Sequence, residues 1–309
     1  MASSLHARSK LGDCLWNSIF VRGNHYRFLS TTLQKQNDKA VIVSLRKKTG
    51  YAIKKCSEAL KINDNDATKA EAWLHEQAAK EGWSKAGKLA QRTTGQGLVG
   101  VLTEDNYAVL VELGCETDFV ARNEMFQELL VACAKSTIDF RRKAIEQNHH
   151  LNSFSNSGIS HVREMVLSRH LNDLPAPDRG GTLEDYIVSV IGKVGENIRL
   201  KRALAVVTEE SNQIFCASHG NTAGGDGNCL WGSFASAVFL KPSRDDLDYS
   251  RLGKGLAHHA IGMNPKDLND PNDGMLNQEY LLNDSLTVSD ICRDNDVELV
   301  DFIRYSINE

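Results

Sequence analysis

Apolar residues between positions 41 and 80 recur at steps of three and four. This spacing gathers apolar side chains on one face of a helix and predicts amphipathic α-helices. Thr49-Gly50 separates a first helix from a second, and the polar run 63–66 supplies turn and N-cap residues before a third. The predicted module of three short helices has the apolar positions Val41, Ile42, Leu45, Ile53, Cys56, Ala59, Leu60, Ala67, Ala70, Trp73 and Leu74.

The pattern changes to alternation after residue 96. Residues 101–113 alternate around the turn Glu104-Asp105-Asn106, which predicts a strand, a turn and a second strand. A helix is expected from near Glu124, with Phe126, Leu129, Leu130 and Cys133 on one face. Residues 141–180 are polar, with irregularly spaced histidines, and indicate a surface linker or insertion. A capping box over residues 182–185 then predicts another helix.

A glycine motif, Gly95-Gln96-Gly97-Leu98-Val99-Gly100, fits G-x-G-x-x-G. A dinucleotide-binding motif requires a strand before these glycines and a helix after them. Here a helix-like segment precedes them and a strand follows, so we interpret the glycines as freeing the chain to enter a sheet edge. No cofactor is predicted.

Composition narrows the class of protein. The chain has 309 residues, of which 41% are hydrophobic, and its formal net charge is -4. That length suits two globular domains, and this charge provides no cationic field for direct nucleic-acid binding. The cations around Trp83 in residues 80–92 could form a small nucleic-acid patch, but a solvated, partly helical linker explains them better. The expected partner is a protein or a small ligand.

The seven cysteines lie at positions 14, 56, 115, 133, 216, 229 and 292. They form no C-x-x-C pair and have no zinc-ligand spacing, so we expect free thiols in a reducing compartment and no metal site. The longest uncharged apolar run falls short of the roughly 18 residues needed to cross a membrane.

The first 40 residues have the composition of a mitochondrial transit peptide. Asp13 is the sole acidic residue up to position 35, whereas basic residues and serines recur. Arg27-Phe28-Leu29-Ser30 resembles a matrix-processing site. The prediction is import into the mitochondrial matrix; a disordered N-terminal tail is the alternative.

Several segments resemble elongation factor Ts in its mitochondrial form. The predicted helical module, through residues 45–50, 56–60 and 70–74, is similar to the N-terminal module of that family and also to a ubiquitin-associated domain. The run from Gly114 to Asn123 contains Thr117-Asp118-Phe119-Val120. It resembles the family's loop that inserts into the GTPase domain of elongation factor Tu.

The resemblance implies an α+β fold. A ubiquitin-associated-like three-helix module would precede a core of two related subdomains, each a small antiparallel sheet packed on helices. Gly195-Glu196-Asn197-Ile198 resembles the family segment that leads into the second subdomain. There the family order of strand, turn, strand and helix would be supplied by residues 214–219, 220–227, 229–240 and 248–263, and residues 297–305 resemble the closing strand.

The resulting division of the chain has five parts. These are a transit segment 1–40, a helical module 41–80, a linker 81–96, and core subdomains 97–205 and 206–309. His219 matches a family contact residue, although Ala217 stands where the family usually has an aromatic residue.

The resemblance implies a non-enzymatic guanine-nucleotide exchange factor for mitochondrial elongation factor Tu. The expected partner-binding residues are Thr117, Asp118, Phe119, Val120 and His219. The local sequence alone also permits a simpler interpretation, in which Thr117 is a helix N-cap and Phe119 is a core anchor.

Two further functions remain as alternatives. Residues 226–231 around Cys229 resemble the nucleophile motif of ovarian-tumour cysteine deubiquitinases, but His258 and His259 lie in a predicted apolar helix, unlike that class. Alternatively, the helical module could make the chain a ubiquitin- or peptide-binding adaptor.

Overall fold

The computed structural model describes residues 39–49, 51, 53–147, 161–166, 171–178, 180–244 and 246–309. Apart from its last two residues, the expected transit segment lies outside them. The chain divides into two compact units, Met1–Ala78 and Ala79–Glu309, and helix α3 (Ala67–Leu89) crosses the division. The fold is mixed α and β, with antiparallel sheets and packed helices.

The described residues of the smaller unit form three helical segments on one apolar core. Residues 39–49 are helical, and α2 (Ile53–Ile62) and the first part of α3 follow. The carboxylate of Asp66 accepts hydrogen bonds from the backbone N–H groups of Thr68 and Lys69, as expected for the start of α3. The core consists of Leu45, Tyr51, Cys56, Ala59, Leu60, Ala70, Leu74 and Ala78.

In its described residues, the larger unit has two main antiparallel sheets and a separate two-stranded pair, Glu279–Tyr280 with Asn283–Thr287. The first has the strand order β3-β4-β2-β1-β7-β6 and the second the order β11-β8-β5. The strands of the first sheet are β1 (Gln96–Glu104), β2 (Tyr107–Cys115), β3 (His161–Val166), β4 (Ile198–Thr208), β6 (Gly224–Asp226) and β7 (Cys229–Gly232). Those of the second are β5 (Gln213–His219), β8 (Phe234–Pro242) and β11 (Val297–Ser306).

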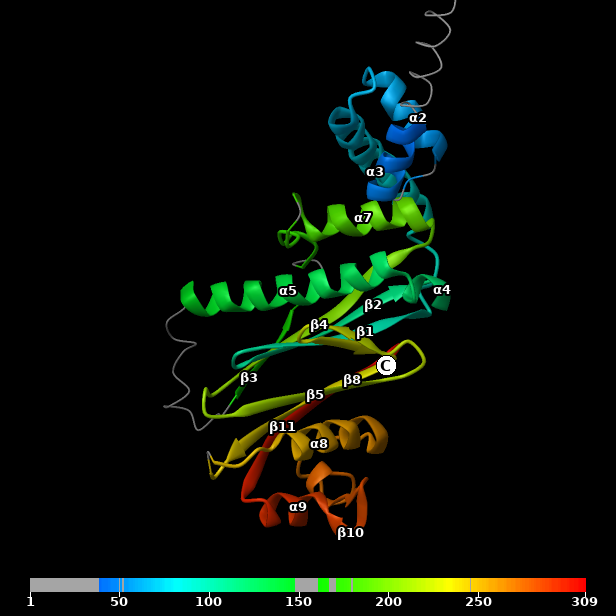
Figure 1. Cartoon of the computed structure of the whole chain (residues 1–309). Helices are drawn as coiled ribbons and strands as arrows, with labels where there is room; N and C mark the ends of the chain where they lie inside the picture. Colours follow the sequence, from blue (N-terminus) through cyan, green and yellow to red (C-terminus); the bar gives the residue numbers. More distant parts are fainter. Residues whose placement is uncertain are drawn as a thin grey trace, which may run out of the picture. The chain divides into compact units, whose positions relative to one another are not determined.

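The two sheets lie face to face between helices (Figure 1). On the first sheet lies α5 (Glu124–Gln147), and α7 (Leu183–Val194) packs on α5 and β4. The short helix α4 (Asp118–Ala121) follows β2. The outer face of the second sheet carries α8 (Ser250–Met263), with η3 (Met275–Asn277), β9 (Glu279–Tyr280), β10 (Asn283–Thr287) and α9 (Val288–Asp294) beyond it.

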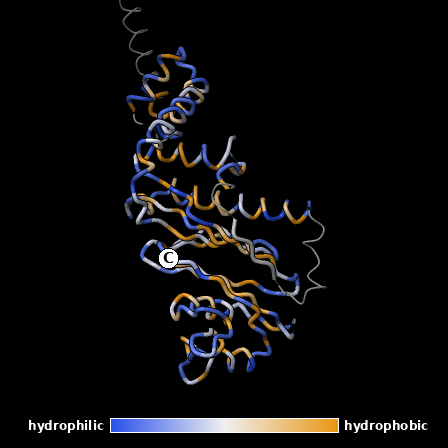
Figure 2. The backbone as a smooth tube through the Cα atoms, turned by 180° about the vertical axis from the view of Figure 1, so that it is seen from behind, coloured by the Kyte–Doolittle hydropathy of each residue, from blue (hydrophilic) through white to orange (hydrophobic). Residues whose placement is uncertain are grey.

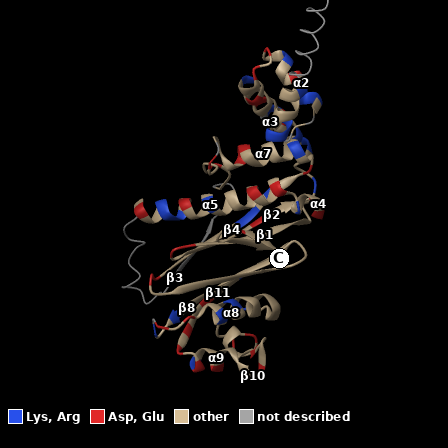
Figure 3. Ribbon diagram, viewed as in Figure 1, with Lys and Arg blue, Asp and Glu red and all other residues tan. Residues whose placement is uncertain are grey.

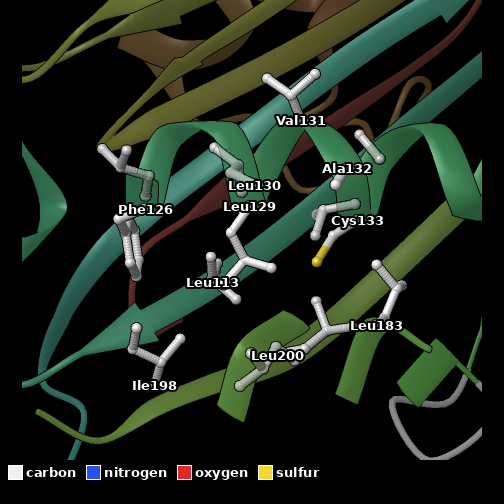
Figure 4. Packing of buried hydrophobic residues seen from close by; sticks show 14 of the residues in the cluster. Leu113, Phe126, Leu129, Leu130, Val131, Ala132, Cys133, Leu183, Ile198 and Leu200 are labelled. Carbon is white, nitrogen blue, oxygen red and sulfur yellow. The ribbon is translucent and has the colours of Figure 1, made fainter. Parts of the chain in front are cut away.

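Strands β1 and β2 are apolar on both faces because each face contacts a different layer. Along β2, Val109, Val111 and Leu113 contact the helices, whereas Ala108 and Leu110 contact the second sheet. Figure 2 shows the resulting apolar colouring of the central strands, and Figure 3 shows the charged residues gathered mainly on the helices. In Figure 4, Phe126, Leu129 and Cys133 of α5 lie over the apolar side chains of this sheet.

The structure revises two sequence expectations. Residues 229–240, expected as one strand, form β7 in the first sheet and β8 in the second. The chain changes sheets at Gly232, where a Cβ atom would lie 2.5 Å from the carbonyl oxygen of His219. Within residues 141–180, expected as a polar surface linker or insertion, β3 pairs with β4. In line with the partly helical segment expected over residues 81–96, α3 continues to Leu89, and Gly82 within it packs against Val188.

A buried carboxylate joins the first sheet to the C-terminal segment. Glu112, on the face of β2 opposite α5, contacts Arg202 at 2.7 Å and Lys201 at 3.1 Å. Its other polar contact is the backbone N–H of Asn308, at 3.1 Å. The guanidinium of Arg202 also lies 3.9 Å from the ring centroid of Tyr305. Removing this carboxylate would leave two partly buried cations without their anion.

We expect Glu112→Ala to lower the free energy of unfolding by about 3 kcal/mol, the lower end of the range for breaking a buried ion pair. Urea unfolding measures this loss. Glu298→Ala, at an exposed position of β11, is the control and should change stability by less than about 0.5 kcal/mol. Equal stability of the two variants would contradict the prediction.

His259 of α8 is buried, and both of its ring nitrogens are engaged. Nδ1 accepts from the backbone N–H of Leu281 at 3.2 Å, so the proton is on Nε2, which donates to Oε1 of Gln278 at 3.0 Å. The ring of Tyr280 stacks on it at 5.9 Å. Burial lowers the pKa of His259 below its usual value.

Because the folded-state pKa of His259 is lowered, the unfolded chain binds more protons as the pH falls below about 6.5. The stability contributed by the neutral ring is complete above that pH and is lost below it. We expect Tm to fall between about pH 7.5 and pH 5.5, with a smaller decrease in His259→Gln. His258→Ala, which changes the exposed neighbour, should retain the wild-type dependence. An unchanged pH profile in His259→Gln would contradict this assignment.

Candidate functional site: the loop after strand β2

Helix α4 is a single turn that begins directly after β2. Thr117 is its N-cap, with extended backbone angles, and its Oγ1 accepts from the N–H of Val120 at 3.5 Å. Asp118 lies in the first turn, where a negative charge complements the helix dipole. Its carboxylate also contacts Arg122 at 2.9 Å. Local capping and one ion pair therefore define this turn.

Adjacent side chains of α4 point into different environments. Val120 and Ala121 are buried in the core beneath α5, whereas Phe119 is 79% exposed. The alternative in which Phe119 anchors the core is therefore wrong, although the expected N-cap role of Thr117 is confirmed. The side chain of Val120, which was also expected to bind the partner, is buried in this chain's own interior.

Two glutamates extend the pairing of β2 with β4 beyond the last residue pair, Cys115 with Ile198. Glu196 accepts from Thr117 twice, from its backbone N–H at 3.0 Å and from its hydroxyl at 2.7 Å. In the opposite direction, Glu116 accepts from the backbone N–H of Asn197 at 2.7 Å. These reciprocal hydrogen bonds, which we call the glutamate clasp, fix the start of the loop.

Further contacts reinforce the glutamate clasp. Arg92 contacts Glu116 at 3.4 Å, and the carbonyl oxygen of Arg92 accepts from the side-chain amide of Asn197 at 2.8 Å. The thiol of Cys115 donates to the carbonyl oxygen of Thr117 at 3.1 Å. Burial, and then the nearby charge of Glu196, raise the pKa of Cys115 to about 12. This thiol is therefore a neutral hydrogen-bond donor.

His219 lies on the other sheet but at the same end of the unit. The end of β2 pairs with the start of β1, Val99 of β1 pairs with Gly232, and Phe234 pairs with His219. Figure 1 shows α4 and the turn after β5 at this common end. His219 is exposed, and its ring centroid lies 6.5 Å from that of Phe234. The fold thus brings together two segments about a hundred residues apart in sequence.

Cys229 is unsuited to nucleophilic catalysis. Its thiol is buried in β7, and burial, with the charge of Asp226, raises its pKa to about 12. A cysteine nucleophile instead requires a readily formed thiolate. The ring of His259 is engaged with Gln278 and Leu281 in the core beneath the second sheet, whereas Cys229 belongs to the core of the first. These observations oppose the deubiquitinase alternative.

The rejected glycine motif lies within and just before β1, and the next element is strand β2 and not a helix. Among the residues that the structure describes, no group of three histidine, cysteine or acidic side chains could hold a metal ion. Nor does any helix in the described ranges have the length and apolarity required to span a membrane.

The glutamate clasp was missing from the predicted site. Glu196 belongs to a segment that the sequence singles out only through its family resemblance. Its contact with Thr117 joins residues 79 positions apart. Apolar periodicity cannot reveal such a polar pairing; the available signal was a glutamate at the predicted entrance of a strand.

Two protein-family models match this chain. The family model "Elongation factor Ts, mitochondrial, N-terminal" matches residues 26–84, and the model "Elongation factor TS" matches residues 116–272. The second match begins at the glutamate clasp and includes α4 and His219. It therefore covers every predicted site residue.

Curated relatives align over most of the chain. A protein named mitochondrial elongation factor Ts from Nematostella vectensis is 40% identical over 87% of this chain and 98% of its own length. Proteins of the same name from Xenopus laevis and Homo sapiens are 38% and 36% identical over 88% of this chain, and over 87% and 84% of their own lengths. The chain belongs to the elongation factor Ts family.

Proposed function

We propose that this chain is a guanine-nucleotide exchange factor for mitochondrial elongation factor Tu and promotes GDP release during translation elongation. The observation that supports this most directly is the 79% exposure of Phe119 on a turn whose next two residues are buried. Full burial of a phenylalanine typically contributes about 1.5–3 kcal/mol. This turn forgoes that gain within its own chain and can obtain it by inserting the ring into a partner.

The proposed mechanism depends on the sensitivity of a GTPase nucleotide site to small displacements of the groups that hold magnesium and phosphate. Such a site holds GDP through backbone donors around the phosphates and through magnesium, which requires nearly ideal octahedral geometry. Insertion of Phe119 between packed elements of the GTPase would displace the groups that hold the ion. The carboxylate of Asp118, beside the ring, would disturb the magnesium shell electrostatically.

Exchange follows from thermodynamic linkage. If this chain weakens GDP binding to the GTPase by some factor, bound nucleotide weakens binding of this chain by the same factor. Arrival of GTP then releases the chain for another cycle. Neither a nucleophile nor a metal or cofactor of its own is required, so we propose a non-enzymatic protein in the sense that it performs no bond chemistry.

The expected site residues have different roles in this proposal. Phe119 and Asp118 contact the GTPase, whereas Thr117 caps the turn and Val120 anchors it from inside. Exposed His219 provides a second contact from the other sheet. Because Ala217 replaces the aromatic residue usual in the family, this contact depends on the ring of Phe234 for packing.

The finer organisation is also a proposal. We infer that the helical module 41–80 is ubiquitin-associated-like and that segment 81–96 links it to two related subdomains, 97–205 and 206–309. An antiparallel strand pair followed by a helix occurs in each half, β1 with β2 before α5 and β5 with β8 before α8, and supports the relation. We propose a transit segment over residues 1–40 and function in the mitochondrial matrix, supported by that segment's composition and by the names of the relatives.

Phe119→Ala tests the function. We expect kcat/KM for release of labelled GDP from mitochondrial elongation factor Tu to fall at least about 30-fold, as for an interface residue worth about 2 kcal/mol. Because the side chain is exposed, Tm should change by no more than about 2 °C. Leu282→Ala, another exposed apolar position, is the control and should retain exchange activity. Unimpaired GDP release by Phe119→Ala would refute the mechanism.

Asp118→Ala distinguishes the electrostatic effect of this carboxylate from the steric effect of the Phe119 ring. If displacement by the ring dominates, this variant should lose about threefold to tenfold in kcat/KM, as expected for a partly exposed charge worth up to about 1.4 kcal/mol. Arg122→Ala tests whether the ion pair merely orients the carboxylate; we expect a smaller loss from this change. Losses from Asp118→Ala as large as those from Phe119→Ala would overturn the ranking.

A further inference from the structure

We propose that Glu196 is a positioning residue for exchange, which holds α4 in the conformation that presents Phe119 to the GTPase. This inference rests on the proposed function but concerns a side chain outside the predicted contact set. Glu196 lies between α7 and β4, 79 residues after Thr117. Its effect on exchange would therefore pass through the fold of this chain.

Glu196 orients the side-chain hydroxyl of Thr117. Thr117 Oγ1 has one proton, which it donates to Glu196 at 2.7 Å. With its proton directed there, the oxygen lone pairs are available to the N–H of Val120, at 3.5 Å. Glu196 thereby fixes the N-cap hydroxyl in its accepting orientation. A free hydroxyl could rotate and donate elsewhere, which would weaken the cap.

Glu196 also binds the backbone N–H of Thr117. The regular β2–β4 pairing ends at Cys115, so the N–H of Thr117 has no ladder partner. Glu196 accepts this N–H at 3.0 Å through its other carboxylate oxygen. One side chain thus holds both donors of Thr117. Hydrogen bonds to an ionised carboxylate are stronger than neutral ones, so this contact extends the order of the sheet to the start of α4.

The length of α4 explains why this attachment would matter for function. A helix of four residues cannot stabilise itself, because a single turn does not repay the entropy of its formation. Its C-terminal half is held by burial of Val120 and Ala121, and its start is held by Glu196. Phe119 lies between these two attachments. If either attachment were lost, the exposed ring would adopt orientations in which it cannot insert into the partner.

A double-mutant cycle in the full chain tests the proposal. We expect Glu196→Ala to lower kcat/KM for GDP release from mitochondrial elongation factor Tu about tenfold, the effect of losing a charge-assisted hydrogen bond. In the Phe119→Ala background, the same change should reduce the remaining activity less than twofold. Glu210→Ala, an exposed position beyond β4, is the matched control and should have no effect in either background.

Two further measurements separate positioning from general destabilisation. Hydrogen exchange of the amides of residues 117–121 in the free protein should accelerate in Glu196→Ala, while protection of β1 and β2 is retained. Glu196→Gln, which keeps one acceptor for the Thr117 hydroxyl, should restore part of the activity. It also serves as the test variant if Glu196→Ala fails to fold.

The outcomes distinguish a positioning role of Glu196 from a purely structural one. Equal losses from Glu196→Ala in both backgrounds, or unchanged exchange activity and amide protection, would overturn the positioning role while leaving the proposed function intact. If Phe119→Ala itself released GDP normally, the proposed function and the positioning role would both fail. Faster amide exchange in Glu196→Ala would then mark Glu196 as structural only.

Discussion

The larger unit depends on burial of the β1–β2 hairpin on both faces. One face lies under α5 and the other against the second sheet, so neither strand can shift without disturbing two apolar layers. Gly100 illustrates how closely these layers approach, because a Cβ atom there would lie 3.1 Å from the side chain of Leu130. Since interiors are packed to crystal-like density, the end of β2 is a rigid point from which to project a loop.

This rigidity is what a wedge requires. A side chain that separates elements of another protein must be held firmly by its own scaffold. If the loop were loosely attached, part of the binding free energy would be lost in ordering it. Here α4 follows the hairpin immediately, with two buried residues on its inner side and the glutamate clasp at its start. The exposed position of Phe119 is therefore imposed by its neighbours, because they fix the direction in which the remaining side chain must point.

Sequence patterns predicted the elements whose cause is local. The capping box at Thr182 is present at the start of α7, and the β1–β2 hairpin turns where Asp105 adopts a positive φ of 53°. The division of residues 229–240 between two sheets was not predicted, since an apolar run buried on both sides contains no mark of which sheet it joins. Likewise, β3 lies within a predominantly polar segment, and its pairing with β4 was not predicted. The segment of residues 114–123 follows a strand as predicted, but the burial of Val120 and the contacts of Glu196 depend on residues distant in sequence.

The change of sheets at Gly232 bears directly on how the proposed contacts could act together. Phe119 lies at the end of the first sheet and His219 at the end of the second, and the chain passes from the first sheet to the second between β7 and β8 at Gly232. A side chain at Gly232 would collide with the backbone of His219, so the connection is as compact as the chain permits. The two points of contact thus keep a fixed separation. In the proposed mechanism, a partner held at His219 meets Phe119 at one defined depth, and binding free energy gained at the first point can be used to insert the ring at the second.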